Sequence, residues 1–421
     1  MFARILLSLT FLMATLPCSS QDVIYDEAKV PTYTLPDPLR FEDGTLVTTP
    51  ADWGKRRAEL LGLFEDHVYG KTPIARPEGM RFEPRTKITD FLDGKATLEE
   101  IRIHFGKGEG GPYLDLLLIK PNRIPEGGAP TFLALNFAGN HTLHPSTEIT
   151  LSTSWMRSGA DDIEQGLVDD DRATEKARGS RVSRWPVEKL IDAGTALASF
   201  YYGDIDPDFD DGFENGIHTI FGKPKPDEWG SIGAWAWGAS RAMDYLETDE
   251  AIDQKRVAIF GHSRLGKTAL WAGAQDERFA LVISNNSGCG GAALSRRHFG
   301  ERVARINTAF PHWFADTFVQ YNENEAALPV DQHQLIALIA PRMVYVASAV
   351  EDEWADPKGE FLAAKHAGPV YEVLGKKGVG VDDQPGLNSP VGNSVRYHVR
   401  TGKHDVTDYD WEQYIRAIKV L

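Results

Sequence analysis

Cysteine is scarce in this sequence: its 421 residues contain two, Cys18 and Cys289. Cys18 falls within an N-terminal segment that has the pattern of an export signal, a positive charge followed by an apolar run and small polar residues. The apolar run, residues 5–16, is too short to cross a bilayer. Cleavage of the signal peptide, residues 1–20, leaves Cys289 as the sole thiol, so no disulfide can form within the mature chain. We therefore expect an exported protein, periplasmic or secreted and not bound to a membrane, whose stability depends on its core.

Positive charge is also in short supply. The net charge is −16, with 45 lysines and arginines against 61 aspartates and glutamates. Nucleic-acid binding requires a basic surface, so this composition excludes it. The chain has no internal repeat and no low-complexity tract, and 42% hydrophobic residues are enough for a large core. We expect residues 21–421 to form a single domain that acts as a monomer.

Strand-like apolar runs alternate with helical periodicity along most of the chain. This alternation predicts a mostly parallel central sheet covered by helices on both faces, in a three-layer αβα sandwich. The predicted strands are residues 98–105, 113–120, 131–137, 196–202, 257–260, 281–285, 343–347 and 395–400. The predicted helices are residues 53–70, 187–192, 235–246, 268–271 onward, 361–374 and 411–418.

Three segments without sustained periodicity surround this framework. Proline-rich residues 21–50 predict an extended arm that wraps the domain. The glycine-rich link 106–111 predicts that the first two strands form a hairpin at the edge of the sheet. The polar stretch 142–182 predicts a surface insertion.

The stretch 257–271 has the pattern of a nucleophile elbow. A buried strand is followed by Gly261, which permits a sharp turn, and then by a helix-forming run, so that Ser263 lies at the tip of a strand-turn-helix unit. The general motif places a glycine two residues after the serine, where this chain has Leu265. An ordinary turn with a surface serine is the alternative. Residues 138–141, after another predicted strand, are where such hydrolases place a second N–H group for the oxyanion.

A serine needs a histidine base, and the histidine needs a carboxylate, before its hydroxyl becomes a nucleophile. In the α/β-hydrolase order, the acid and the base follow the serine along the chain, each just past a later strand. Asp352 follows the predicted strand 343–347, and His404 follows the last predicted strand. For the acid, three neighbouring carboxylates compete with Asp352: Glu351, Glu353 and Asp356.

An acidic loop, residues 203–211, contains Asp204, Asp206, Asp208 and Asp210. Closely spaced aspartates can bind calcium, but a proline breaks the EF-hand spacing and no glutamate closes the loop. We expect a solvated loop here. The chain offers no clear metal motif, and neither a metal nor a cofactor is expected for the triad chemistry.

Four stretches of the sequence are motifs typical of one enzyme family: Gly261-His262-Ser263-Arg264-Leu265-Gly266-Lys267, Leu338-Ile339-Ala340-Pro341-Arg342, Trp354-Ala355-Asp356-Pro357 and Gly402-Lys403-His404-Asp405. Together they resemble the bacterial glucuronoyl esterases, carbohydrate esterases of the α/β-hydrolase superfamily. The resemblance covers the chain from about Trp53 to its C-terminus, and its Gly-x-Ser-Arg-x-Gly-Lys element accounts for the displaced glycine.

The resemblance implies roles that spacing alone does not give. It implies that Arg264 reaches its guanidinium to the oxyanion, that Lys267 and Glu301 bind sugar hydroxyls and that Trp354 packs against the uronate. A surface glutamate in an ion pair and a buried core tryptophan are the alternatives for the last two residues. Many members of the family place the catalytic acid in the region 284–287, where this chain has asparagines. The resemblance then implies the variant in which the acid is Asp352.

The implied activity is hydrolysis of the ester between (4-O-methyl-)glucuronic acid side chains of glucuronoxylan and lignin alcohols, through a glucuronoyl-serine intermediate. Three alternatives remain at this point. An acetyl-xylan esterase or related carbohydrate esterase would use the same triad, and a serine peptidase of this fold would cleave amides. A non-catalytic glycan-binding protein would keep Trp354 and Glu301 without a working triad.

Overall fold

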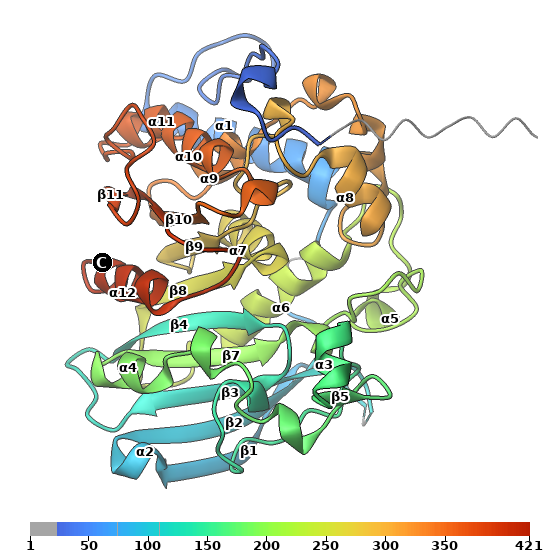
Figure 1. Cartoon of the computed structure of the whole chain (residues 1–421), viewed down its shortest axis with the longest axis vertical. Coiled ribbons are helices and arrows are strands. Elements are labelled where there is room, and N and C mark those ends of the chain that lie inside the picture. The colour runs from blue at the N-terminus through green and yellow to red at the C-terminus, as the bar shows by residue number, and fades with distance from the viewer. Residues whose placement is uncertain (1–22, 74, 109) are drawn as a thin grey trace, which may run out of the picture.

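The computed structural model describes residues 23–73, 75–108 and 110–421, and the predicted export signal, residues 1–20, lies outside this part of the chain. The described residues form a ten-stranded sheet in the order β1-β2-β3-β7-β4-β8-β9-β10-β12-β11 (Figure 1). Its strands are β1 (Arg81–Asp90), β2 (Ala96–His104), β3 (Tyr113–Pro121), β4 (Ala129–Asn136), β7 (Ala196–Tyr201), β8 (Ile252–His262), β9 (Leu281–Asn285), β10 (Met343–Ala349), β11 (Val391–Gly392) and β12 (Val395–Arg400).

Six neighbouring strands in the middle of the sheet, β7, β4, β8, β9, β10 and β12, run parallel. Every residue of β4, β7 and β9 is buried, as expected for strands that are covered on both faces. Parallel strands present their carboxyl ends at one edge of the sheet, so the loops that follow them converge there. The sequence places Ser263, Asp352 and His404 on three of these loops.

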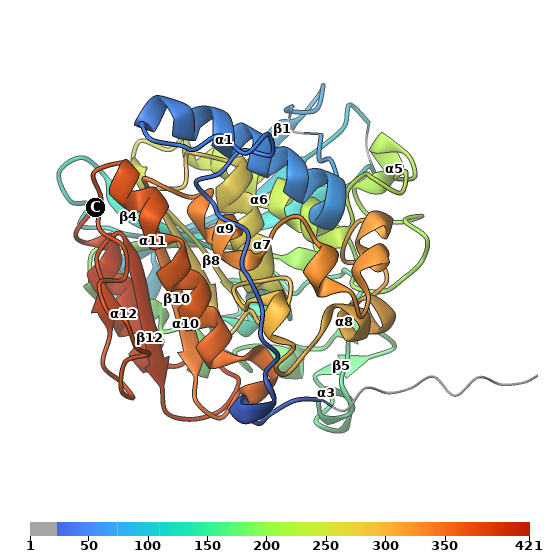
Figure 2. The ribbon, with the colours of Figure 1, turned by 90° about the horizontal axis from the view of Figure 1, so that it is seen from above.

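Helices cover both faces of the sheet and form a separate apolar cluster with each. On β4, Leu133 and Leu135 point into one cluster and Phe132 and Ala134 into the other, which is the alternation of a strand. One face is covered by α1 (Pro50–Phe64), α6 (Ser231–Leu246), α7 (Arg264–Gln275), α9 (Gln332–Ala337), α10 (Pro357–His366) and α11 (Gly368–Val373). The other is covered by α4 (Val187–Asp192) and α12 (Asp408–Ile418). The predicted three-layer αβα sandwich is confirmed, with the strand order and connections of an α/β-hydrolase (Figures 1 and 2).

The predicted edge of the sheet is wrong. Residues 98–105 and 113–120 do form a hairpin, as β2 and β3, but β1 pairs with β2 and extends the sheet by one strand. Most of β1 is exposed, and its sequence combines charges with Pro84, where the register shifts. Charges, proline and a bulge are typical of an edge strand and hide the apolar alternation that would have predicted it.

Two predicted helices differ in detail. The helix predicted at 361–374 is two helices, α10 and α11, because Pro369 lacks the N–H that would continue the hydrogen-bond ladder. The helix predicted at 53–70 starts earlier, at Pro50, where Thr49 caps it. It ends in a π-helical turn before Gly70, whose φ of 80° and close approach to the Glu228 carbonyl require glycine.

The arm and the insertion both lie on the surface of the sandwich. Residues 23–49 cross the face formed by α9 and α10, where the His333 side chain contacts the Pro36 carbonyl at 2.8 Å (Figure 2). Residues 142–182 contain α3 (Ala160–Glu164) and the small hairpin of β5 (Val168–Asp169) and β6 (Arg172–Ala173). The remaining short helices are α2 (Phe91–Gly94), α5 (His218–Phe221) and α8 (Val303–Ala309). Among the described residues, no helix combines the length and apolar character needed to span a membrane.

Candidate active site

Ser263 occupies a strained turn between β8 and α7, with φ of 57° and ψ of −128°. The turn is possible because Gly261 has no side chain: a Cβ there would lie 1.8 Å from the Leu265 carbonyl oxygen. Gly266 is needed for close packing, since its Cβ would lie 2.9 Å from Ser287 Cβ. The elbow therefore requires glycine at 261 and 266, and Leu265 is tolerated between them. A strained backbone at an exposed nucleophile is typical of this motif.

His404 and Asp352 meet at the carboxyl edge of the sheet. The Nδ1 atom of His404 lies 2.6 Å from Oδ2 of Asp352, and Nδ2 of Asn286 donates to the same oxygen at 2.9 Å. Burial favours the neutral acid, but the hydrogen bonds from His404 and Asn286 outweigh it and hold the pKa of the Asp352 carboxyl below its ordinary value. The pair can therefore hold an imidazole in one tautomer, with a charged carboxylate behind it.

The three competing carboxylates have other environments. Glu351 and Glu353 are exposed. Asp356 is buried, but it pairs with Arg297 and caps the N-terminus of α10. Among these four acids, only Asp352 contacts His404. Asn286, which lies in the region 284–287, orients Asp352 instead of replacing it.

His404 is brought to the elbow by His262. The two imidazole rings lie 4.4 Å apart between centroids, and His262 directly precedes Ser263. Nδ1 of His262 lies 2.6 Å from Oδ1 of Asn285, whose amide donates to the Tyr414 hydroxyl at 2.9 Å. Burial lowers the pKa of His262 well below its ordinary value, and the charge of His404 lowers it further. His262 is therefore a neutral ring against which His404 packs.

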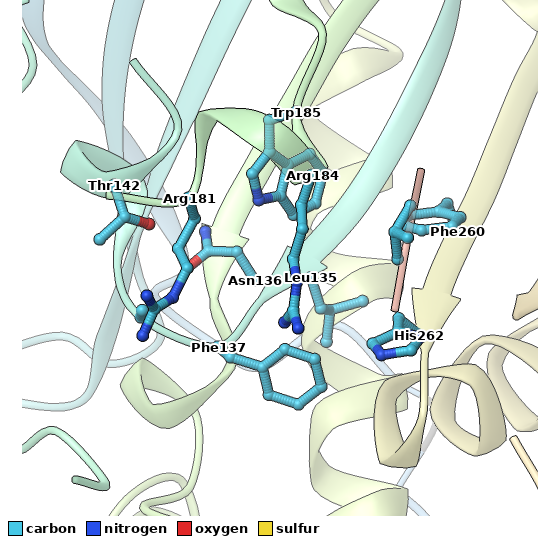
Figure 3. Close-up of a pocket in the computed structure, with 11 residues that line it drawn as sticks. Leu135, Asn136, Phe137, Thr142, Arg181, Arg184, Trp185, Phe260 and His262 are labelled. Atoms are coloured by element: carbon cyan, nitrogen blue, oxygen red, sulfur yellow. The ribbon is translucent and has the colours of Figure 1, made fainter. Parts of the chain in front are cut away.

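A small hollow borders His262. Phe137, Arg184, Trp185 and His262 border it (Figure 3). Its volume is about 20 Å³. That volume holds about one water molecule. The loop 138–141 borders the same region, but the Gly139 N–H donates to Oδ1 of Asn136 at 2.8 Å. A second oxyanion donor from this loop stays a prediction.

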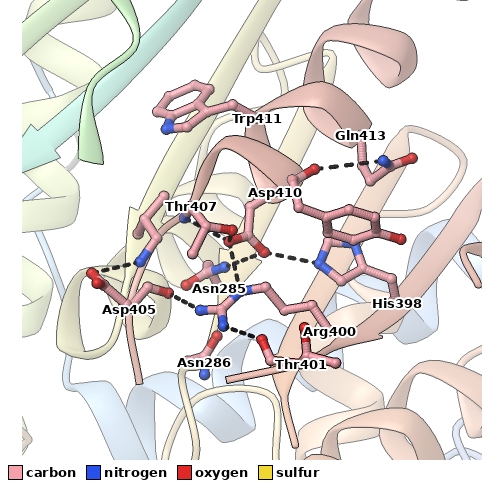
Figure 4. Close-up of polar contacts among 12 residues, drawn as sticks. Asn285, Asn286, His398, Arg400, Thr401, Asp405, Thr407, Asp410, Trp411 and Gln413 are labelled. Atoms are coloured by element: carbon pink, nitrogen blue, oxygen red, sulfur yellow. Dashed lines mark hydrogen bonds and ion pairs between the residues drawn. The ribbon is translucent and has the colours of Figure 1, made fainter. Parts of the chain in front are cut away.

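The loop that holds His404 is clamped by Arg400 (Figure 4). The Arg400 guanidinium donates to the carbonyls of Thr401, Lys403 and Asp405, at 2.9, 3.1 and 2.5 Å. Its Nε donates to Oδ2 of Asp410 at 2.8 Å, which ties the loop to the first turn of α12. The buried Arg400–Asp410 pair thus fixes the backbone on both sides of the imidazole.

The guanidinium of Arg264, the residue after Ser263, forms an ion pair with Asp208 of the loop that follows β7. The same carboxylate accepts from Trp313 Nε1 at 2.7 Å and the Tyr202 hydroxyl at 2.9 Å, and lies 2.9 Å from His312 Nε2. Burial opposes ionisation, but these partners hold the pKa of Asp208 far below its ordinary value. The cation is therefore positioned before any substrate arrives.

The expected solvated character of the loop 203–211 is wrong. Asp206 and Asp208 are both buried, and Asp208 also pairs with Arg157 from the insertion at 3.0 Å. The acidic composition of the loop predicted exposure to solvent, because the side chains that pair with its aspartates come from distant parts of the chain. One feature of the sequence could have indicated a functional loop: it follows β7, at the edge of the sheet where functional side chains gather. Within the described residues, no group of three or more histidine, cysteine or acidic side chains is placed to hold a metal ion.

Lys267, Glu301 and Trp354 lie together at the rim of the elbow. The buried Nζ of Lys267 donates to the Ser287 carbonyl at 2.6 Å and lies 3.9 Å from Oε2 of Glu301. The Glu301 N–H donates to the Trp354 carbonyl at 3.0 Å. Burial lowers the pKa of Lys267 and raises the pKa of Glu301. The opposite charge of the partner acts in the other direction on each pKa but is outweighed by burial. Trp354 is 37% exposed, so it is not a core residue.

Glu360 is a buried acid that sequence reasoning missed. Its Oε1 accepts from the N–H groups of Ser287 and Gly288 at 2.8 and 3.0 Å, and its Oε2 from the Ser348 hydroxyl at 2.6 Å. It therefore joins the loop after β9 to the end of β10, beneath Asn286 and the carbonyl that receives Lys267. Burial raises the pKa of Glu360 to about 8.

We expect Glu360→Gln to remove a pH dependence of stability. In the folded protein the acid keeps its proton up to a pH of about 8, whereas the unfolded chain releases it near the ordinary glutamate pKa of 4.5. The folded state binds more protons across that window, so wild-type stability falls as the pH rises through it, by on the order of 5 kcal/mol. Glutamine mimics the protonated acid. Urea unfolding of both proteins at pH 5 and pH 8 tests this, and a difference that stays constant with pH contradicts it.

Comparisons with known proteins identify the family of this chain. A family model described as glucuronyl esterase of fungi matches residues 183–375. A carbohydrate esterase from an unknown prokaryotic organism is 51% identical over 397 residues, which cover 93% of this chain and 90% of that protein. A 4-O-methyl-glucuronoyl methylesterase of Schizophyllum commune is 29% identical over 81% of this chain and 74% of its own length.

Solved structures show the same relationship. A promiscuous esterase of carbohydrate esterase family 15 from a marine bacterial metagenome has a TM-score of 0.88 and 50% identity, covering 94% of this chain and 99% of its own. A glucuronoyl esterase from Solibacter usitatus has a TM-score of 0.87 and 49% identity, over 93% of this chain and 99% of its own. The chain therefore belongs to the glucuronoyl esterases, carbohydrate esterase family 15, and is a carboxylic ester hydrolase.

Proposed function

We propose that this protein hydrolyses the ester between (4-O-methyl-)glucuronic acid side chains of glucuronoxylan and lignin alcohols. The observation that carries the proposal is the buried Lys267–Glu301 pair beside the Ser263 elbow, at 3.9 Å. An enzyme that hydrolyses simple acyl esters needs only a nucleophile and an oxyanion site. A buried lysine and a carboxylate beside the nucleophile supply, in addition, a hydrogen-bond donor and an acceptor for the hydroxyls of a sugar acid. We further propose that residues 21–421 form one domain, exported after cleavage of residues 1–20 and active as a monomer.

The reaction proceeds by two acyl transfers. His404 takes the proton of the Ser263 hydroxyl as its oxygen attacks the C6 carbonyl of the uronate, and Asp352 stabilises the imidazolium that forms. Arg264 and N–H groups at the start of α7 stabilise the oxyanion of the tetrahedral intermediate. The C–O bond to the alcohol then breaks, and His404 protonates the departing alkoxide. Water, deprotonated by His404, attacks the glucuronoyl-serine and releases the uronic acid.

Asp208 is a positioning residue in this scheme. A guanidinium that is already paired and stacked does not have to reorganise as negative charge develops on the substrate. Arg264 lies over the rings of Trp313, Phe137 and Phe310, with centroid distances of 4.9, 5.5 and 5.7 Å. These contacts leave Arg264 little freedom and supply a cation that is poorly hydrated and therefore effective.

Rates on a benzyl ester of glucuronic acid, an aryl acetate and a peptide amide test the proposed substrate. We expect the highest kcat/KM on the glucuronate ester and no cleavage of the amide. A preference for the acetate would favour an acetyl-xylan or related carbohydrate esterase, and amide cleavage would favour a peptidase. Binding of the uronate without turnover of any of the three would favour a glycan-binding protein.

Lys267→Ala should act on substrate binding. Removal of a hydrogen bond from a charged donor to a sugar hydroxyl costs about 1.5–3 kcal/mol, so KM for the glucuronate ester should rise by about tenfold to a hundredfold. The rate on the aryl acetate should stay within about twofold, because that substrate has no hydroxyl for Nζ to bind. Steady-state kinetics on both esters make the comparison. An equal loss on both would assign Lys267 to the fold of the elbow and not to the sugar.

A further inference from the structure

The N-terminal arm reaches the rim of the active site. Ile24 forms a parallel β-bridge with Phe299, and the Gly300 N–H donates to the Ile24 carbonyl at 2.9 Å. Gly300 directly precedes Glu301 of the Lys267–Glu301 pair. Figure 2 shows the blue arm running across α10 to the end of the molecule where these loops gather. A segment far away in the sequence therefore borders the candidate sugar site.

Ion pairs hold this part of the arm in place. Glu27 pairs with Arg297 at 2.5 Å and with Lys358 of α10 at 2.7 Å. Arg297 is buried and also pairs with Asp356 at 2.8 Å. Asp26 caps a short 3₁₀ turn, Glu27–Lys29, by accepting from the Ala28 N–H at 3.0 Å. The arm is thus anchored immediately after Tyr25, through a buried arginine that also contacts the loop after β10.

Tyr25 and Trp354 are two exposed aromatic residues on this rim. Tyr25 is 46% exposed, with its ring packed edge-on against Phe299 at 6.1 Å between centroids. Gly300 brings the two segments together: it binds Ile24, and a Cβ on it would lie 2.5 Å from the Trp354 carbonyl oxygen. Partial burial and the charges of Glu353 and Asp352 raise the pKa of the Tyr25 hydroxyl.

We propose that Tyr25 and Trp354 form an aromatic rim that binds the xylan backbone carrying the esterified glucuronate. This inference rests on the proposed function. A sugar held by Lys267 and Glu301 is linked through its anomeric carbon to a polymer, and the polymer must leave the site across the neighbouring surface. Trp354 is exposed beside Glu301, whose N–H its carbonyl accepts, and Tyr25 lies on the arm segment that contacts the same loop through Gly300.

The chemistry of the rim suits a neutral polysaccharide. The faces of pyranose rings carry C–H groups that pack against aromatic rings, while their hydroxyls bind polar groups at the ring edges. Exposed aromatic rings lose hydration favourably when a sugar covers them, and their position is already fixed by the Phe299 and Glu27 contacts, so little conformational entropy is lost on binding. The arm thereby favours polymer-linked esters over small ones.

The test compares Tyr25→Ala, Tyr25→Phe and Val23→Ala on two substrates: benzyl glucuronate and the same ester carried on a xylo-oligosaccharide. Because an aromatic contact to the sugar is lost, Tyr25→Ala should raise KM for the oligosaccharide ester by about fivefold and leave the kinetics on benzyl glucuronate unchanged. Tyr25→Phe should keep the wild-type preference. Val23 is a matched control because it is exposed on the same arm, and its replacement should leave the kinetics on both substrates unchanged.

Equal effects of Tyr25→Ala on both substrates, or no effect on either, would overturn the proposal. Thermal unfolding of each variant shows whether the arm has detached, and an intact melting temperature with an unchanged oligosaccharide KM would also count against it. If the wild-type protein does not hydrolyse benzyl glucuronate, the proposed function is wrong. The small ester therefore distinguishes an error in the proposed function from an error in the proposed aromatic rim.

Discussion

Ser263→Ala is expected to reduce kcat on a glucuronate ester by about 10⁶, to near the limit of detection. Alanine removes the attacking oxygen, and the remaining oxyanion contacts cannot replace a covalent intermediate. The strained backbone at Ser263 has φ of 57°, which alanine tolerates as poorly as serine does, so the elbow itself should keep its shape. Initial rates at saturating substrate measure the loss.

Ser263→Ala also needs a binding measurement beside the rate. Because Lys267, Glu301 and Trp354 remain, the variant should still bind the uronate, and calorimetric titration with glucuronic acid should give an affinity close to that of the wild type. Loss of binding together with activity would indicate a collapsed elbow. Turnover close to the wild-type rate in a correctly folded variant would rule out Ser263 as the nucleophile.

Asp352→Asn is expected to lower kcat by about 10⁴. Asparagine carries no charge, and when its amide nitrogen takes the place of Oδ2 it presents N–H groups to both His404 and Asn286, where the carboxylate oxygen accepted from both. The imidazole then turns to the wrong tautomer, and its cationic form loses the negative charge 2.6 Å away. The geometry of the loop should change little, so KM should rise much less than kcat falls.

The matched control for Asp352 is Glu353→Gln, the same loss of charge one residue along the chain. Glu353 is exposed, and its replacement should leave kcat within about twofold, since isolated surface charges contribute little. If Glu353→Gln were the more damaging change, the acid would have to be reassigned. Asp356 is unsuitable as a control because it caps α10 and pairs with a buried arginine.

The framework of the fold could be predicted from the sequence because its strands are buried on both faces. Mainly apolar runs such as 281–285 and 343–347 correspond closely to β9 and β10. The same reasoning failed at β1, where an edge strand carries charges and proline. It also missed the break between α10 and α11, because apolar periodicity continues across Pro369 while the hydrogen bonds do not.

Residues placed by local rules could be predicted, and those placed by long-range contacts could not. Ser263, Asp352 and His404 each follow a strand, and the structure brings Asp352 and His404 into contact beside the elbow. Asp208 and Glu360 resemble surface acids in the sequence. Their burial depends on partners such as Arg264 and Ser348, which only the folded chain brings near.

The arm illustrates the same limit. Its prolines predict an extended conformation, but nothing in its own sequence says which surface it crosses. The anchor is an ion pair between Glu27 and Arg297, separated by most of the chain. Tyr25 could therefore enter the argument about the substrate only after the structure placed it beside Phe299.

Covalent labelling with a fluorophosphonate, followed by peptide mapping, tests the central claim most directly, because this reagent reacts with a serine activated by a histidine base. We predict one phosphonyl group per chain, attached to Ser263, with activity lost in proportion to labelling, and no labelling in His404→Ala. A label on another residue, or full glucuronate esterase activity after complete labelling of Ser263, would contradict the account.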